Sequence, residues 1–165
     1  MTYDSIHQLA AMEITTSEVA QVAAARASGL SDATCVALFK IFRDQKQPFD
    51  AGEDAAGLFR ARVSEDAIVE LARLRQLRLS SGEFQAMRLA GLSDATVLAV
   101  ARHRALNQPV LSGASLAGLK NAGVRESTLL ELARRGVPDA KVDEITSFRR
   151  HGGSDAEILG RFTGS

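Results

Sequence analysis

The residue types that most often carry chemistry are sparse in this chain. Its histidines are His7, His103 and His151, and they share no spacing typical of metal ligands. The zinc-binding patterns CxxC and HExxH do not occur. The lone Cys35 lies in an amphipathic segment, where a small buried thiol is the expected state. We therefore predict no metal site, and a single cysteine allows no internal disulfide bond.

The acidic residues and glycines do not form a catalytic or phosphate-binding pattern either. Carboxylates recur at the expected starts of helices, where they interact favourably with the helix dipole. The glycines Gly52, Gly57, Gly113 and Gly118 recur at matching repeat positions, which favours close helix packing. No GxGxxG, Walker or nucleophile-elbow pattern occurs. The sequence predicts a protein that is not an enzyme, with no cofactor and no identifiable small-molecule substrate.

An internal repeat determines which elements carry these residues. The segment Gly29–Thr34 recurs letter for letter as Gly91–Thr96, about 62 residues later. With a one-residue slip, Pro48–Arg73 also aligns with Pro109–Arg134. This similarity indicates duplication of a unit of about 61–62 residues.

A shorter motif recurs within each half with a period near 30 residues. It consists of an apolar segment, a glycine, an aliphatic residue, a serine and an acidic residue, followed by a second apolar segment. The five copies are centred on Gly29, Arg62, Gly91, Gly123 and Gly152. Glycine can adopt the left-handed conformation that ends a helix, and serine can cap the next one. Each copy therefore predicts a helix, a short turn and a second helix.

The helix starts can be assigned from their capping residues. The expected N-cap serines are Ser31, Ser64, Ser93 and Ser154. The pairs with capping-box spacing are Thr15 with Glu18, Ser80 with Glu83, and Ser154 with Glu157. The expected first-turn acids are Asp32, Glu65, Asp94, Glu126 and Asp155.

The apolar residues follow helical spacing, and no stretch alternates long enough to indicate strands. We predict an all-α fold of about ten short helices, built as tandem helix-turn-helix repeats in a single compact array. The expected divisions are an N-terminal helix or cap at 1–14, a first repeat pair at 15–76, a second pair at 77–137, and a partial fifth repeat with a C-terminal cap at 138–165.

Composition restricts the classes of partner. The 165 residues are 45% apolar and 24% charged, and Lys plus Arg equals Asp plus Glu at 20 each. A neutral chain has no overall attraction to nucleic acid or to an anionic membrane. No segment is apolar over the length of a membrane span. Met1–Asp4 shows no secretory signal, which favours the cytoplasm if Met1 is the native start, and the envelope or periplasm if a leader was removed.

A helix, a short turn and a helix also form the DNA-reading helix-turn-helix motif. There the first residues of the second helix contact bases and phosphates, so Arg, Lys, Asn or Gln is expected. Here Ser31–Thr34 and Ser64–Ala67 place carboxylates at that point. Nucleic-acid binding is therefore the less favoured alternative, and Arg102 and Arg104 would be its contacts.

The motif resembles a pattern of bacterial proteins in which short tandem helical segments read roughly LxxAG, a hydrophobic residue, Ser, and Asp or Glu. Such segments occur, often in pairs, in predicted lipoproteins and in other envelope-associated or uncharacterised bacterial proteins. Ala27–Asp32 is similar to the first member of a pair and Phe49–Glu65 to the second. Arg62 and Arg125 depart from the pattern, since they replace a turn glycine and a capping serine. The resemblance implies no named activity and no catalytic residues.

Positions that differ between the halves are candidates for function, because scaffold positions repeat. Phe39, Phe42 and Phe49 in the first half correspond to Ala101, Arg104 and Val110 in the second. Either the three rings enlarge the core of the first half, or they form an exposed apolar surface for a partner. We predict Phe39, Phe42 and Phe49 as the partner surface of a protein-interaction or scaffold module, which binds another protein or forms a homo-oligomer.

Overall fold

The structure, a computed structural model, describes residues 1–164. All regular structure in that part is helical and none of it is β-strand, which confirms the all-α prediction. The α-helices are α1 (Tyr3–Ala11), α2 (Thr16–Ala27), α3 (Asp32–Asp44), α4 (Gly52–Arg60), α5 (Glu65–Arg73), α6 (Ser81–Leu89), α7 (Asp94–Ala105), α8 (Gly113–Asn121), α9 (Glu126–Arg134), α10 (Val142–Arg150) and α11 (Asp155–Phe162). A short 3-10 helix, η1 (Asp139–Lys141), precedes α10.

The chain folds as two compact units, Met1–Gln85 and Ala86–Ser165. The division falls inside α6, whereas the sequence predicted one array with its repeat pairs divided between residues 76 and 77. The predicted N-terminal helix at 1–14 contains α1. The predicted partial repeat at 138–165 contains two complete helices, α10 and α11.

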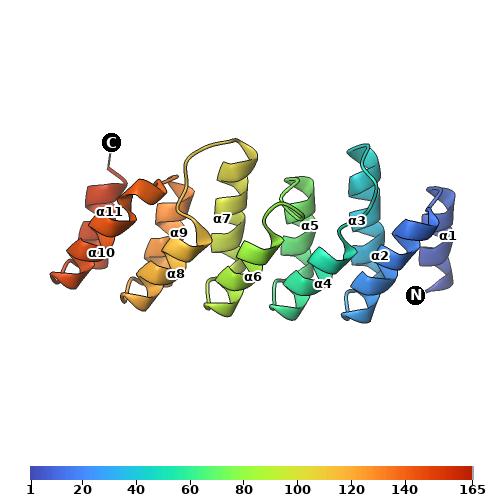
Figure 1. Cartoon of the computed structure of the whole chain (residues 1–165), viewed down its shortest axis with the longest axis horizontal. Helices are drawn as coiled ribbons and strands as arrows, with labels where there is room; N and C mark the ends of the chain where they lie inside the picture. The colour runs from blue at the N-terminus through green and yellow to red at the C-terminus, as the bar shows by residue number, and fades with distance from the viewer. Residues whose placement is uncertain (165) are drawn as a thin grey trace. The chain divides into compact units, whose positions relative to one another are not determined.

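In the first unit the helices form two layers. α3 packs against α1 and α5 in one layer, and α2 packs against α4 in the other, as Figure 1 shows. α2–α3 and α4–α5 are helix-turn-helix pairs in which the second helix belongs to the α3 layer. α1 therefore occupies the place of a second helix. Leu30, Leu38, Leu58, Ile68 and Leu71 are fully buried in this unit.

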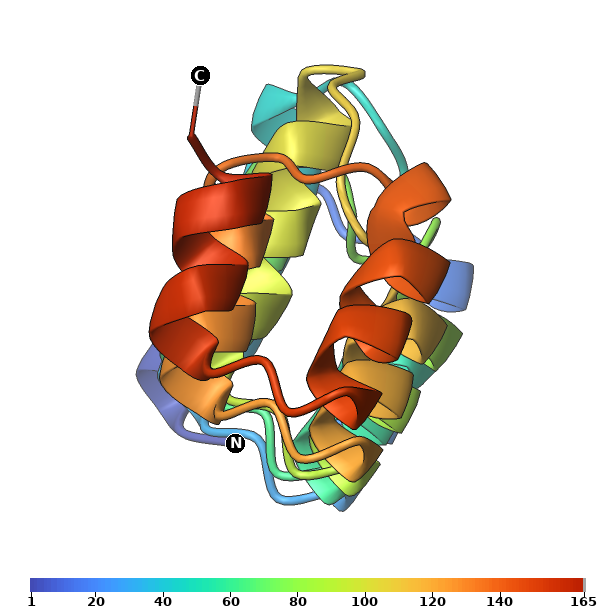
Figure 2. The ribbon, with the colours of Figure 1, turned by 90° about the vertical axis from the view of Figure 1, so that its left-hand side faces the viewer.

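The second unit has the same arrangement. α9 packs against α7 and α11, and α8 packs against α10. Figure 2, in which α10 and α11 lie nearest the viewer, shows these two helices side by side in their separate layers. Leu92, Val100, Leu119, Leu129 and Leu132 are fully buried in this unit.

Each helix-turn-helix turn contains a residue with positive φ. The glycines Gly29, Gly91, Gly123 and Gly152 have φ values of 104°, 79°, 88° and 93°. Arg62 occupies the same place in the second turn and has a φ of 66°. A residue with a Cβ pays about 1–2 kcal/mol in this conformation. The second turn therefore keeps the shape of the others at a cost in stability.

The predicted caps form at most helix starts. The hydroxyls of Ser31, Ser64, Ser93 and Ser154 each accept a hydrogen bond from the backbone N–H three residues later. Capping boxes form at Thr15 with Glu18 and at Ser154 with Glu157. Ser80 directly precedes α6, and its capping box with Glu83 stays a prediction. Arg125 occupies the N-cap position of α9, and its side chain makes no capping bond.

Most first-turn acids bond to the preceding second helix and also lie at the positive end of their own helix dipole. The carboxylate of Glu65 accepts hydrogen bonds from the Ser31 N–H at 3.2 Å and from the hydroxyls of Ser31 and Thr34. Burial raises the pKa of Glu65, but these hydrogen bonds outweigh it and hold the pKa below its usual value. The same arrangement joins Glu126 to Ser93 and Thr96, and Asp155 to Arg125 and Thr128. Each acid therefore fastens its repeat to the one before.

Candidate functional site

An apolar groove of about 540 Å³ lies between α1 and α2 in the first unit, and we call it the α1–α2 groove. Its lining includes Met1, Ile6, Leu9, Val19, Val22 and Arg26. Leu9 and Val22 are buried, whereas Ile6 is 53% and Val19 50% exposed. Large aliphatic side chains thus remain open to solvent on both sides of a concave surface.

α1 is held in place as the second helix of a repeat would be. Its N-cap residue is Thr2, whose hydroxyl accepts a hydrogen bond from the Ser5 N–H at 3.2 Å. The Thr2 N–H donates to the carboxylate of Asp32, in the first turn of α3. Ser31 and Glu65 make the corresponding bond one repeat later. α1 is therefore fixed on α3, with the groove on its α2 side.

α2 is held in place by the buried carboxylate of Glu18, which is 2% exposed. It accepts hydrogen bonds from the Thr15 N–H and the Phe49 N–H, both at 2.9 Å, and pairs with the Arg43 guanidinium at 2.8 Å. Burial raises the pKa of Glu18, but these hydrogen bonds and the Arg43 charge lower it below the usual value. Glu18 thereby joins the start of α2 to the end of α3 and to the segment that leads into α4.

The α2 wall of the groove corresponds to a face of α4 that is covered. Aligning the turns at Gly29 and Arg62 places Val19, Val22, Ala23 and Arg26 at the positions of Gly52, Ala55, Ala56 and Phe59. These positions lie on one face of a helix. In α4, Gly52, Ala55 and Ala56 are buried. In α2, Val19 and Ala23 are exposed.

α2 itself covers that face of α4. A Cβ added at Gly52 would lie 2.0 Å from the Gln21 carbonyl oxygen, so only glycine fits beneath α2 at this point. The Gly52 N–H donates to the Gln21 side chain at 2.9 Å. At the other end of the face, the Phe59 ring lies 3.2 Å from the place of a Cβ on Gly29. A first helix of a repeat is thus the element that covers such a face in this unit.

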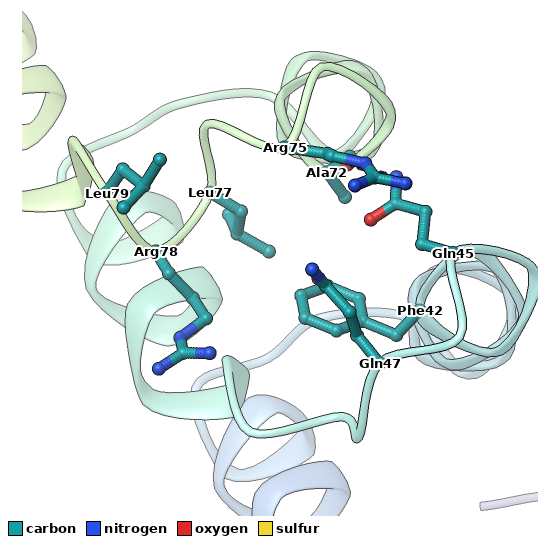
Figure 3. A pocket seen from close by; sticks show the side chains of 8 residues that line it. All are labelled: Phe42, Gln45, Gln47, Ala72, Arg75, Leu77, Arg78 and Leu79. Atoms are coloured by element: carbon teal, nitrogen blue, oxygen red, sulfur yellow. Dashed lines mark hydrogen bonds between the residues drawn. The ribbon is translucent and has the colours of Figure 1, made fainter.

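A second hollow, of about 370 Å³, lies where α3 and α5 end (Figure 3). The Phe42 and Leu77 side chains point into it, and Gln45 and Arg78 are at its rim. Gln45 donates a hydrogen bond to the Ala72 carbonyl at 3.0 Å, and Arg78 pairs with Asp50 at 2.9 Å. The α1–α2 groove has the larger volume of the two and is lined by apolar side chains apart from Arg26, so we take it as the candidate site.

The predicted partner surface at Phe39, Phe42 and Phe49 is corrected by the structure. The three side chains are 0%, 3% and 1% exposed. The Phe49 ring packs edge-on against Phe39 and Phe42, with ring centroids 6.2 Å and 5.3 Å apart. The segment between α3 and α4 folds back over α3 and buries the rings, so they enlarge the core of the first unit.

We did not predict Ile6 or Val19 from the sequence. A signal for them was present at Met1–Thr2, which has the order of an apolar residue and a hydroxyl cap found at Leu30–Ser31. Leu30 is fully buried, whereas Met1 is 43% exposed. Thr2 in the role of a repeat cap identifies α1 as a second helix, beside which α2 leaves one side open.

Two of the histidines contact backbone carbonyl groups, and the cysteine is buried, so a structural role accounts for each of them. Among residues 1–164, no three His, Cys, Asp or Glu side chains lie close enough together to hold a metal ion. His103 Nε2 lies 2.9 Å from the Arg134 carbonyl oxygen, and His151 Nδ1 lies 2.7 Å from that of Ser147. Cys35 is buried, and burial raises the pKa of its thiol to about 11. In the same part of the chain, no helix has the length and apolar character to cross a membrane.

Comparisons with protein-family models, with curated proteins and with solved structures found no match. The resemblance to bacterial tandem repeats therefore stays a prediction.

Proposed function

We propose that this protein is a non-enzymatic helical-repeat module that binds another protein through the α1–α2 groove. The observation that carries the proposal is the exposure of Val19 and Ala23 on a helix face whose counterpart in α4, at Gly52 and Ala56, is buried beneath α2. A face with the pattern of an interior contact is thus open to solvent.

The physical properties of the groove support binding of an apolar partner. Contiguous exposed apolar surface that lines a concavity is typical of interaction sites, because covering it removes that surface from water. Both helices that form the walls are fixed to the rest of the unit. The Thr2–Asp32 hydrogen bond holds α1, and the buried carboxylate of Glu18 holds α2. A partner would therefore meet a preformed surface, which lowers the entropy lost on binding.

Nucleic-acid binding remains the less well supported alternative. The carboxylates of Glu65, Glu126 and Asp155 lie at the starts of α5, α9 and α11, where a reading helix would contact phosphates. Negative charge at these points repels a nucleic-acid backbone, and the chain as a whole is neutral.

The proposal can be tested by photo-crosslinking in an extract of the native host. A photoreactive phenylalanine analogue is placed at Val19 in one variant and at Leu89, which is 78% exposed but outside the groove, in the control. We expect a discrete protein adduct from position 19 that survives nuclease treatment and is absent from position 89. The proposal is wrong if both positions give the same adducts or if the adduct disappears with nuclease.

A further inference from the structure

We propose that the occupant of the α1–α2 groove is one α-helix of a partner protein, similar to the first helices of the repeats in this chain, and that Arg26 binds its C-terminal carbonyl groups. The proposal rests on the proposed function, since it names what the groove binds. Three observations carry it. They are the internal contact of α2 with α4, the small residues on the outgoing face of the first helices, and the contacts made by the counterparts of Arg26. The outgoing face of a first helix is the side that meets the next repeat along the chain.

The internal contact shows what shape fits. The face of α4 that corresponds to the groove wall is covered by α2, a helix of 12 residues that packs along it. α4 itself has nine residues. The α2 wall of the groove therefore corresponds to the α4 face, and in the next repeat that face is covered by one helix of 12 residues.

The side of a first helix that meets the next repeat has small residues. Gly57 is on this side of α4, and a Cβ there would lie 2.6 Å from the Gln85 side chain. Spacing from the turns places Ala24 of α2 and Gly118 of α8 at the same position, and the contact between α8 and α10 leaves open space around Gly118. A helix that docks on α2 in the same manner needs a small residue there, because Val19 and Val22 already fill the wall.

Two counterparts of Arg26, Lys120 of α8 and Arg149 of α10, bind the turn of the preceding repeat. Arg149 of α10 donates to the Gly123 carbonyl oxygen at 2.7 Å, at the C-terminal end of α8. Lys120 of α8 donates to the carbonyl oxygen of Gly91, the turn residue that follows α6. A helix C-terminus leaves carbonyl groups without intrahelical donors, so a cation at that point satisfies them and interacts with the helix dipole.

Arg26 is prepared for the same contact. It donates to the backbone carbonyl of Leu30, four residues later, and pairs with Asp32 at the start of the next helix. Arg149 makes the same two contacts in its own repeat. Arg26 also lines the groove. Its guanidinium, which carries five N–H donors, can therefore hold the carbonyls of a docked helix without leaving Asp32.

A second copy of the chain fits the groove less well. Continued stacking would bring the outgoing face of α10 onto α2. Arg161 lies over the Phe148 ring on that face, at 5.2 Å, and pairs with Glu144 at 3.2 Å. Docking would bring this charged pair against Val19, so we assign the groove to a partner with an apolar, small-residue face.

The probe for this proposal is a stapled, C-terminally amidated peptide of residues Leu111–Val124, which contain α8 and its turn. The staple joins positions 113 and 117, which lie about 100° or more around the helix from Gly118. The matched control peptide carries Gly118→Phe. Binding to the full-length protein is measured by fluorescence anisotropy, with a label on the peptide N-terminus.

We expect saturable binding of the probe, and at least about tenfold weaker binding of the Gly118→Phe peptide and of the probe to a Val19→Asp protein. Arg26→Met is expected to weaken binding by a similar factor, and Arg26→Lys to retain it, because Lys120 makes the same contact in the repeat. Circular dichroism of each variant verifies that the fold is intact.

Equal binding of the two peptides, or no binding of the probe, would overturn the assignment of a helix as the occupant. If Arg26→Lys loses binding as fully as Arg26→Met, the role given to Arg26 is wrong. A dimer in light scattering that Val19→Asp dissociates would instead identify a second copy as the occupant. These outcomes are distinct from failure of the proposed function, which is detected by loss of the discrete adduct at Val19.

Discussion

Replacing Glu18 with alanine is expected to destabilise the first unit by about 3 kcal/mol. The carboxylate is 2% exposed, accepts the Phe49 N–H at 2.9 Å and pairs with Arg43 at 2.8 Å. Removing it leaves a buried backbone donor without its acceptor, which costs about 1–3 kcal/mol. Breaking a buried ion pair costs about 3–5 kcal/mol, but Arg43 is 33% exposed and water recovers part of that loss.

Urea unfolding followed by circular dichroism measures this effect. With a slope of about 2 kcal/mol/M, the Glu18→Ala midpoint should fall by about 1.5 M at pH 7. Because the pKa of Glu18 is lowered in the folded protein, its contribution is present above the unfolded pKa of about 4.3 and is lost as the pH falls through the folded pKa. The difference between wild type and variant should therefore shrink below about pH 4.

Glu157→Ala is the matched control. Glu157 has the same position in the capping box of Ser154, but its surroundings are exposed. Both variants lose the local box, and only Glu18→Ala also loses the contacts with Arg43 and Phe49. If the two midpoints fall equally, or if the effect of Glu18→Ala does not depend on pH between 3 and 7, the buried network does not stabilise the unit as argued.

Three further changes test local features of the fold. Arg62→Gly should raise the free energy of unfolding by about 0.5–1 kcal/mol, because glycine adopts a φ of 66° without strain; an unchanged or lower urea midpoint would contradict this. Arg125→Ser should add about 1 kcal/mol by supplying the missing side-chain cap of α9, measured in the same titration against Arg125→Ala. Cys35 should react with iodoacetamide at pH 8 only as fast as the first unit opens, since the thiol is buried and its pKa is about 11; rapid labelling of folded protein in mass spectrometry would refute this.

The prediction that Phe39, Phe42 and Phe49 form an exposed partner surface was wrong for a physical reason. Helical spacing identifies an apolar face, but it does not identify what covers that face. The rings are buried by the segment that contains Phe49 itself, which returns over α3. The same limit applies to Ala23 and Ala56, which have matching places on α2 and α4 and opposite exposure.

The sequence by itself determined the all-α class, the turns and most of the caps. A turn at Gly29 or a cap at Ser31 depends on φ and on hydrogen bonds between residues at most four apart, so the local letters are sufficient. Only the tertiary structure decided that Glu65 bonds to Ser31 and that Ile6 and Val19 face an open groove. Those properties depend on which helix lies alongside, and contacts between residues about 30 apart are created by packing rather than by neighbouring residues.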